Sequence, residues 1–202
     1  YKTDHGRILF EGEEIQRREP GEIVKRGISR TFQNIRLFPD MRVIENVLVG
    51  AHIKTGYSFL SSIFRSRAFR EEEDAITLRA LKILKEVGLY ERRDDYASNL
   101  PYGDQRKLEI ARAIATGAKL ILLDEPAAGM NPQETQELMA MIRWIRDQFD
   151  LTVLLIEHDM SLVMGICERI YVLEYGQIIA QGTPEEIRRD PEVIRAYLGG
   201  EA

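Results

Sequence analysis

The sequence has little cysteine, no long apolar run and no large excess of charge of one sign. Cys167 is the only cysteine among 202 residues, so a disulfide within the chain is impossible and a reducing compartment is expected. The longest unbroken aliphatic runs have four residues, as at 120–123, against the roughly 18 that a membrane-spanning helix needs. The formal net charge is −5 and the basic residues are scattered, which argues against a nucleic-acid partner.

What is present is enough for a folded core, since 44% of the residues are hydrophobic and 30% are charged. Short β-branched runs between glycines predict a β-rich part over 1–39, and helical spacing of apolar residues predicts a mainly helical part over 40–115. From 116 to 202 the predicted strands are 119–123, 151–156 and 170–175, and the predicted helices are 132–149 and 160–167. Strands separated by crossover helices form parallel sheets, so we predict an α/β fold with a parallel sheet buried on both faces.

Local start signals support the helix assignments in this last part. Asn131-Pro132 and Asp190-Pro191 each place an N-cap residue before a proline that needs no backbone N–H. The segment 183–186 has the pattern of a capping box with proline at its first helical position. We therefore predict that two short helices close the chain.

The strongest chemical signal is the run LILLDEPAAGMNP at 120–132. A buried strand that ends in two consecutive carboxylates places Asp124 and Glu125 at the carboxyl edge of a parallel sheet, where open α/β folds bind ligands. Since successive strand side chains point to opposite faces, the two have different roles: Asp124 would hold a hydrated Mg²⁺, and Glu125 would polarise a water beside a γ-phosphate. The alternative is a strand that ends in an exposed acidic turn.

A histidine follows the next predicted strand, at the same edge of the sheet. His158 stands in the segment Ile156-Glu157-His158-Asp159, where its imidazole could hydrogen-bond a phosphate oxygen. The alternative for a single histidine is a structural or merely exposed side chain.

A glutamine follows the predicted strand at 28–32. The Gln33 side chain can contact a metal-bound water and orient a nucleophilic one without a change of charge, and the apolar stretch after it is a candidate partner surface. Its alternative is a solvated loop glutamine.

A glycine-containing loop, Leu100-Pro101-Tyr102-Gly103-Asp104-Gln105-Arg106, leads directly into a helical stripe. Such a loop presents backbone N–H groups and the positive end of a helix dipole to an anion. An ordinary helix-start turn is the alternative.

In this order and spacing, the four motifs resemble the nucleotide-binding subunit of an ATP-binding cassette (ABC) transporter over nearly the whole chain. The resemblance implies a P-loop NTPase-type parallel sheet core with a helical subdomain, the whole of 1–202 belonging to a single ABC ATPase domain. It identifies Gln33 with the Q-loop, 100–106 with the signature loop, Asp124-Glu125 with the Walker B pair, 129–131 with the D-loop and His158 with the switch histidine.

What the resemblance implies about chemistry is ATP hydrolysis with Mg²⁺ at composite sites shared by two ATPase subunits. Glu125, His158 and Gln33 would be catalytic, and Asp124 and Gln33 would contact the metal. The resemblance also predicts nucleotide contacts for six residues, namely Leu100, Pro101, Tyr102, Gly103, Asp104 and Asn131. The expected partners are a second ATPase subunit, identical or not, and membrane permease subunits bound through Gln33–Met41, which would place the protein on the cytoplasmic face of the membrane.

A narrower resemblance is to the ATPases of branched-chain amino-acid importers. It is carried by the segments 97–100, 106–112, 156–160 and 195–199. A DNA-repair or translation ATPase of the same superfamily would need a long coiled-coil insertion or tandem cassettes, and the sequence has neither.

The chain departs from the family pattern in three respects. It contains no Gly-Lys dipeptide, hence no GxxxxGK[ST] loop, and it starts at Tyr1 rather than Met, so we expect an N-terminally incomplete chain. Pro101 and Tyr102 stand where the signature carries serine and glycine, and Asn131 replaces the D-loop aspartate. The alternative function is therefore an inactive fragment or a non-hydrolytic structural partner.

Overall fold

The computed structural model describes residues 3–54 and 67–198. The chain divides into two compact units, Tyr1–Leu154 and Leu155–Ala202. No helix within the described stretches is long and apolar enough to cross a membrane.

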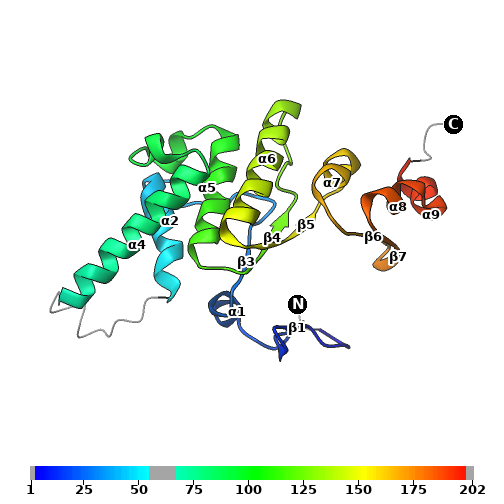
Figure 1. Ribbon diagram of the computed structural model, residues 1–202, viewed down its shortest axis with the longest axis horizontal. Helices are drawn as coiled ribbons and strands as arrows, with labels where there is room; N and C mark the ends of the chain where they lie inside the picture. The colour runs from blue at the N-terminus through cyan, green and yellow to red at the C-terminus, as the bar shows by residue number, and fades with distance from the viewer. Residues whose placement is uncertain (1–2, 55–66, 199–202) are drawn as a thin grey trace. The chain divides into compact units, whose positions relative to one another are not determined.

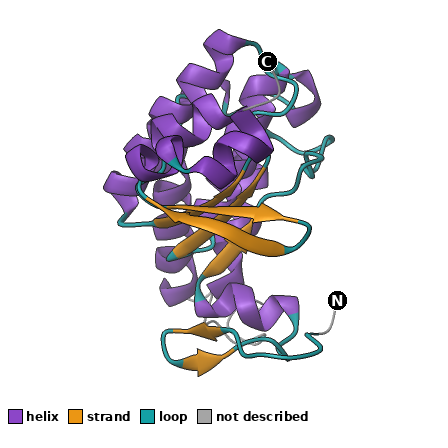
Figure 2. Ribbon diagram, turned by 90° about the vertical axis from the view of Figure 1, so that its right-hand side faces the viewer, coloured by secondary structure: helices purple, strands orange, loops and turns teal. Residues whose placement is uncertain are grey.

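The first unit opens with a short antiparallel hairpin next to the N-terminus, followed by a helix (Figure 2). The hairpin pairs β1 (Leu9–Phe10) with β2 (Glu13–Glu14), and the helix is α1 (Pro20–Arg26). The sequence pattern did not predict α1, which is too short for an apolar stripe. Its ends are nevertheless marked, because Pro20 lies in its first turn and Gly27 ends it with a φ of 106°.

Three helices of the first unit lie side by side, at the left in Figure 1. They are α2 (Val43–Ala51), α4 (Arg67–Glu86) and α5 (Tyr102–Ala115), with short turns η1 (His52–Lys54), η2 (Tyr90–Arg92) and η3 (Ala97–Asn99) between them. Their facing side chains include Val47, Ile83 and Leu108, all fully buried. Gly50 permits the close approach of α2 to α5, because a Cβ there would overlap the carbonyl oxygen of Arg112. This packing fixes α5, whose start is the predicted signature loop.

The first unit also contains the predicted parallel sheet. β3 (Ile28–Arg30) pairs in parallel with β4 (Leu120–Asp124), and β5 (Thr152–Ile156) is third in the order β3-β4-β5. The crossover helix α6 (Pro132–Phe149) has the predicted bounds, and Asn131 caps it by accepting a hydrogen bond from the Glu134 N–H at 3.0 Å. The parallel sheet with a crossover helix confirms the α/β fold class.

The predicted burial of the parallel sheet on both faces does not hold for β5 in the described residues. Leu154 and Ile156, on one face of β5, are 51% and 54% exposed, while alternate residues of the strand are half-buried. The apolar run at 151–156 does not distinguish a strand covered on both faces from one covered on a single face, because the covering elements are distant in sequence.

The second unit is built on an antiparallel pair, which the sequence pattern did not predict. Its elements are α7 (Met160–Ile166), β6 (Ile170–Glu174), β7 (Gln177–Gly182), α8 (Pro184–Arg189), α9 (Pro191–Val193) and the π-helical turn η4 (Ile194–Leu198). β6 pairs with β7 across a turn of Tyr175 and Gly176, whose φ angles are 48° and 79°. A two-residue turn joins only antiparallel strands, so β6 and β7 form a hairpin and not a crossover unit.

The closing helices of the second unit start where predicted. Thr183 caps α8, and its backbone N–H and hydroxyl donate to Glu186 Oε2 at 2.8 and 3.2 Å, hydrogen bonds that lower the pKa of that carboxyl. Asp190 accepts from the backbone N–H groups of Glu192 and Val193 at the start of α9. The core under these helices consists of Val163, Ile170, Val172, Ala180, Ile187 and Val193.

Candidate functional site

The two consecutive carboxylates lie at the end of β4, as expected from the sequence. Asp124 is the last residue of the strand, and its Oδ2 accepts from the Arg30 guanidinium of neighbouring β3 at 2.6 Å. Glu125 follows with a φ of 44°, a left-handed backbone that costs a non-glycine residue on the order of 1–2 kcal/mol. The strand end therefore holds Glu125 in a conformation that the local sequence alone disfavours.

Gln33 and Glu125, which are 92 positions apart in the sequence, are brought into direct contact. Gln33 Nε2 donates to Glu125 Oε2 at 2.8 Å. This direct hydrogen bond orients the Glu125 carboxylate, which can accept a proton, and does not use the amide oxygen of Gln33. The structure thus joins two of the residues to which the sequence analysis gave catalytic roles.

A buried arginine that the sequence analysis did not single out holds the backbone of the Gln33 segment. Arg106, in α5, has no exposure to solvent, and its Nη1 and Nη2 donate to the carbonyl oxygens of Phe32 and Gln33 at 2.7 and 2.8 Å. Nη1 also donates to Glu109 Oε2 at 2.9 Å. An Arg and a Glu three positions apart on a helix are usually an ion pair exposed to solvent. The local sequence therefore gives no indication that Arg106 and Glu109 are buried.

The predicted signature loop forms the N-terminus of α5. Pro101 precedes Tyr102, the first helical residue, and the side chain of Asp104 accepts from Lys107 Nζ at 3.2 Å. Gln105 Nε2 donates back to the carbonyl oxygen of Leu100 at 2.8 Å, closing the loop on itself. The first backbone N–H groups of a helix have no partner within it, and α5 is long enough to have a full dipole.

Two predicted site residues, Asn131 and His158, lie at the start of α6 and after the end of β5. The Asn131 side chain caps α6, as described above, and its backbone N–H donates to Glu134 Oε2 at 3.0 Å, so both groups serve the helix start. His158 belongs to the second unit; its side chain is 75% exposed, with Nδ1 3.9 Å from the Glu157 carboxylate. The adjacent Asp159 caps α7.

The segment after Gln33 is held by polar contacts and exposes one aromatic ring. The Asn46 side chain, in α2, accepts from the Phe38 N–H at 2.9 Å and donates to the Phe38 carbonyl oxygen at 3.1 Å. Phe38 itself is 45% exposed. The Arg112 guanidinium lies 5.6 Å from the Phe38 ring. Burial lowers the pKa of Arg112, and the Glu109 carboxylate opposes that shift.

The oxygen groups at the sheet edge fit a magnesium ion of the kind held partly by substrate. No group of three or more His, Cys, Asp or Glu side chains among the described residues could hold a metal. Mg²⁺ beside phosphates takes one or two protein oxygens and fills its other positions with water and phosphate, so a carboxylate and an amide oxygen of the kind that Asp124 and Gln33 carry have the chemistry that it needs.

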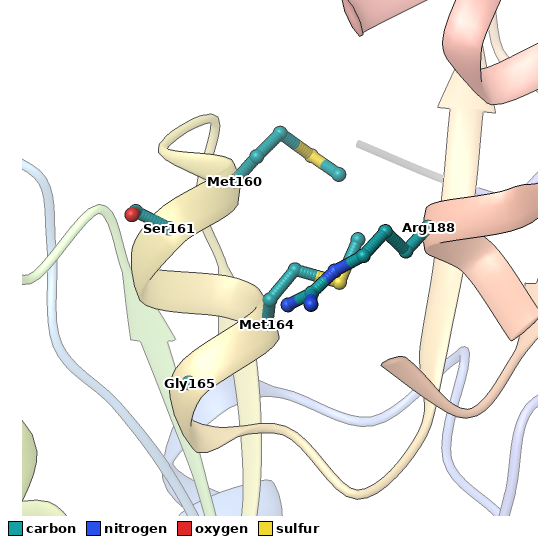
Figure 3. Close-up of a pocket in the computed structure, with 5 residues that line it drawn as sticks. All are labelled: Met160, Ser161, Met164, Gly165 and Arg188. Carbon is teal, nitrogen blue, oxygen red and sulfur yellow. The ribbon is translucent and has the colours of Figure 1, made fainter. Parts of the chain in front are cut away.

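The second unit contains a separate cavity of about 270 Å³ lined by Met160, Ser161, Met164, Gly165 and Arg188. The two methionine side chains extend toward Arg188, and Ser161 points away (Figure 3). None of the residues predicted for catalysis or nucleotide binding lines it.

Comparison with known proteins gives matches along almost the entire chain. Residues 1–128 match the family described as ABC transporter, and residues 177–202 match the family described as branched-chain amino acid ATP-binding cassette transporter.

The curated relatives include the high-affinity branched-chain amino acid transport ATP-binding protein LivG of Escherichia coli K12, which is 47% identical over 98% of this chain and 78% of its own length. The corresponding protein BraF of Pseudomonas aeruginosa is also 47% identical, with the same coverage. A probable LivG of Methanocaldococcus jannaschii is 36% identical over 98% of this chain and 77% of its own.

Among solved structures, an ATP-binding cassette of an ABC transporter in its ADP conformation superposes with a TM-score of 0.80 at 35% identity. The match covers 98% of this chain and 79% of that one. A nucleotide-free cassette superposes with a TM-score of 0.78 at 34% identity, covering 98% and 78% of the two chains.

Proposed function

The chain belongs to the ABC transporter ATP-binding proteins, and from that membership we propose that it is the ATP-binding and hydrolysing subunit of an importer for branched-chain amino acids. The solute is supported by the LivG and BraF relatives, which are named for branched-chain amino acid transport, and by the family match at residues 177–202. The chain spans 78% of the length of the Escherichia coli relative.

The contact between Gln33 and Glu125 is the observation that carries the catalytic part of the proposal. Glu125 accepts a proton from the attacking water as the general base, and the Gln33 amide, 2.8 Å from that carboxylate, orients the water. The left-handed backbone of Glu125 directs its side chain away from the course of β4, toward Gln33. The chain's own contribution is thus an aligned base at the carboxyl edge of the sheet.

Asp124 and the Gln33 amide oxygen are the groups that would hold Mg²⁺. The bound ion supplies charge neutralisation for the phosphoryl oxygens. Arg30, whose guanidinium lies 2.6 Å from Asp124 Oδ2, fixes the position of that carboxylate at the end of the strand. His158 hydrogen-bonds a phosphate oxygen in this proposal, and its high exposure leaves the imidazole accessible for that contact.

The signature loop acts on the nucleotide of a second ATPase subunit. The N–H groups of Tyr102, Gly103 and Asp104 in the first turn of α5 are the anion donors, and Pro101, which has no N–H, contributes none. Membrane permease subunits bind at Gln33–Met41, where the exposed Phe38 ring offers an apolar contact on a segment anchored by Asn46. The subunit is then a peripheral protein on the cytoplasmic face of the membrane.

Reconstituted transport tests this function. The transporter is purified from its own cells with the subunit that carries this sequence, placed in vesicles, and supplied with MgATP and labelled leucine, isoleucine or valine. We expect ATP-dependent uptake of these solutes and a hydrolysis rate that rises with them. Uptake of a different solute class would refute the narrower assignment, and absence of hydrolysis would refute the ATPase.

A further inference from the structure

Tyr102 occupies a position in the signature loop where the family pattern carries glycine, and its side chain makes contacts that a glycine lacks. The Tyr102 hydroxyl donates to the carbonyl oxygen of Ala128 at 3.0 Å and accepts from Arg106 Nη2 at 3.3 Å. Its ring packs against Gly129, where an added Cβ would stand 3.8 Å from the nearest ring atom. Gly129 and Ala128 belong to the turn that follows Glu125. The side chain therefore joins the start of α5 to this turn.

Arg106 connects Tyr102 to the Gln33 segment. The guanidinium that meets the tyrosine hydroxyl also donates to the carbonyl oxygens of Phe32 and Gln33. Its orientation is fixed, because the side chain has no exposure and pairs with the buried Glu109 carboxylate. Tyr102 thus reaches the Gln33 backbone through a group that has no freedom to reorient.

These hydrogen bonds close a ring that includes Glu125. The Gln33 side chain donates to the Glu125 carboxylate at 2.8 Å, and the Ala128 N–H donates to the Glu125 carbonyl oxygen at 3.2 Å. From Glu125 the path runs through Ala128, Tyr102, Arg106 and Gln33 and returns to Glu125. Tyr102 is the only residue of the ring in the first turn of α5. In the proposed function, this turn contacts the nucleotide held by the partner subunit.

We propose that Tyr102 is a positioning residue that ties the turn after Glu125 to α5, so that the position of α5 sets the orientation of the Glu125 carboxylate. The proposal rests on the proposed function, in which Glu125 is the base and the first turn of α5 meets the nucleotide held by the partner subunit. Movement of α5 on closure of the dimer is then transmitted through the tyrosine hydroxyl to the base of the same chain. A glycine at this position would have no side chain to make this connection.

The matched test replaces one hydroxyl inside the ring and one outside it. Tyr102→Phe removes the bridge and keeps the aromatic ring. Tyr197→Phe is the control, because the Tyr197 hydroxyl also donates to a backbone carbonyl oxygen, that of Leu173 at 2.8 Å, and belongs to no part of the ring. The measurements are kcat and KM for ATP hydrolysis by the assembled transporter, and amide hydrogen exchange of Ala128 and Met130 in the ATPase subunit without nucleotide.

We expect Tyr102→Phe to lower kcat by about fivefold, with KM changed less than twofold, since loss of one net hydrogen bond corresponds to a factor of that size. Exchange at Ala128 and Met130 should accelerate by a similar factor, because their N–H groups donate to the carbonyl oxygens of Glu125 and Ala127 within the tethered turn. Tyr197→Phe should change neither quantity.

An unchanged kcat in Tyr102→Phe would overturn the proposal. A raised KM at unchanged kcat would also overturn it, since it would make the Tyr102 hydroxyl a direct contact of the nucleotide and not part of a tether. The exchange measurement needs no hydrolysis and so separates two failures. Unchanged exchange refutes the tether itself, while accelerated exchange in a subunit whose wild type does not hydrolyse ATP refutes the proposed function and leaves the tether.

Discussion

Replacement of Glu109 by glutamine is predicted to lower the free energy of unfolding of the first unit by about 3–5 kcal/mol, the usual cost of removing one partner from a buried ion pair. Glu109 Oε2 lies 2.9 Å from Arg106 Nη1, and the two side chains are 2% and 0% exposed. The substitution preserves the shape of the side chain but removes its charge and one of its two acceptor oxygens, which accept from the Arg36 N–H and from Arg106 Nη1. Arg106 would stay charged and buried, and its Nε already has no hydrogen-bond partner among the described residues.

Glu11→Gln is the matched control in the same unit. Glu11 Oε1 is 2.6 Å from Lys119 Nζ, a shorter contact than that of the buried pair, but the two side chains are 54% and 62% exposed. Exposed pairs contribute about 0–1 kcal/mol because water screens them. If contact distance set the loss of stability, Glu11→Gln would cost more, whereas burial predicts that Glu109→Gln costs more.

Urea unfolding followed by tryptophan fluorescence provides the measurement. Trp144 is the single tryptophan of the chain, and its Nε1 donates to Glu86 Oε2 at 2.8 Å, between α6 and α4 of the first unit. Its signal therefore reports the unfolding of that unit. Equal losses in the two variants, or a Glu109→Gln variant as stable as the wild type, would refute the burial argument.

Two further predictions concern packing and thiol chemistry. Gly50→Ala should lower the free energy of unfolding by at least about 1–3 kcal/mol, because its Cβ would overlap the Arg112 carbonyl oxygen. Gly21→Ala, which has open space around it, should be neutral or stabilising by up to about 1 kcal/mol. Urea unfolding measures both variants, and equal effects would contradict the close approach of α2 and α5. Burial raises the pKa of the Cys167 thiol, so the rate of alkylation near pH 7 should be lower in the folded chain than in urea. The rate in the folded chain should still be increasing with pH above about 8.5. Equal rates in the folded chain and in urea would contradict this prediction.

The elements that the sequence predicted well carry their signals locally. Helix α6 has the predicted bounds because Asn131 and Pro132 mark its start and the apolar residues behind them repeat at helical spacing. The turn at Tyr175 and Gly176 was missed because a tyrosine with positive φ has no sequence signature. Without that turn, the apolar run before it reads as one more parallel strand.

The candidate site was predictable as a set of residues but not as an arrangement. Asp124, Glu125 and Gln33 were identified from their places after strands, yet only the fold brings Gln33 within 2.8 Å of Glu125. Arg106 was missed because its burial depends on the backbone of a segment more than 70 positions away. A tertiary contact of this kind leaves no periodic trace in the sequence.

The central claim is that Glu125 is the base that activates water, and single-turnover phosphate release tests it most directly. The assembled transporter is compared with its Glu125→Gln variant and with Glu137→Gln, which replaces an exposed carboxylate on α6. We predict that Glu125→Gln still binds ATP and releases phosphate about 10²–10⁴-fold more slowly, while Glu137→Gln matches the wild type. Phosphate release by Glu125→Gln at close to the wild-type rate would contradict the account.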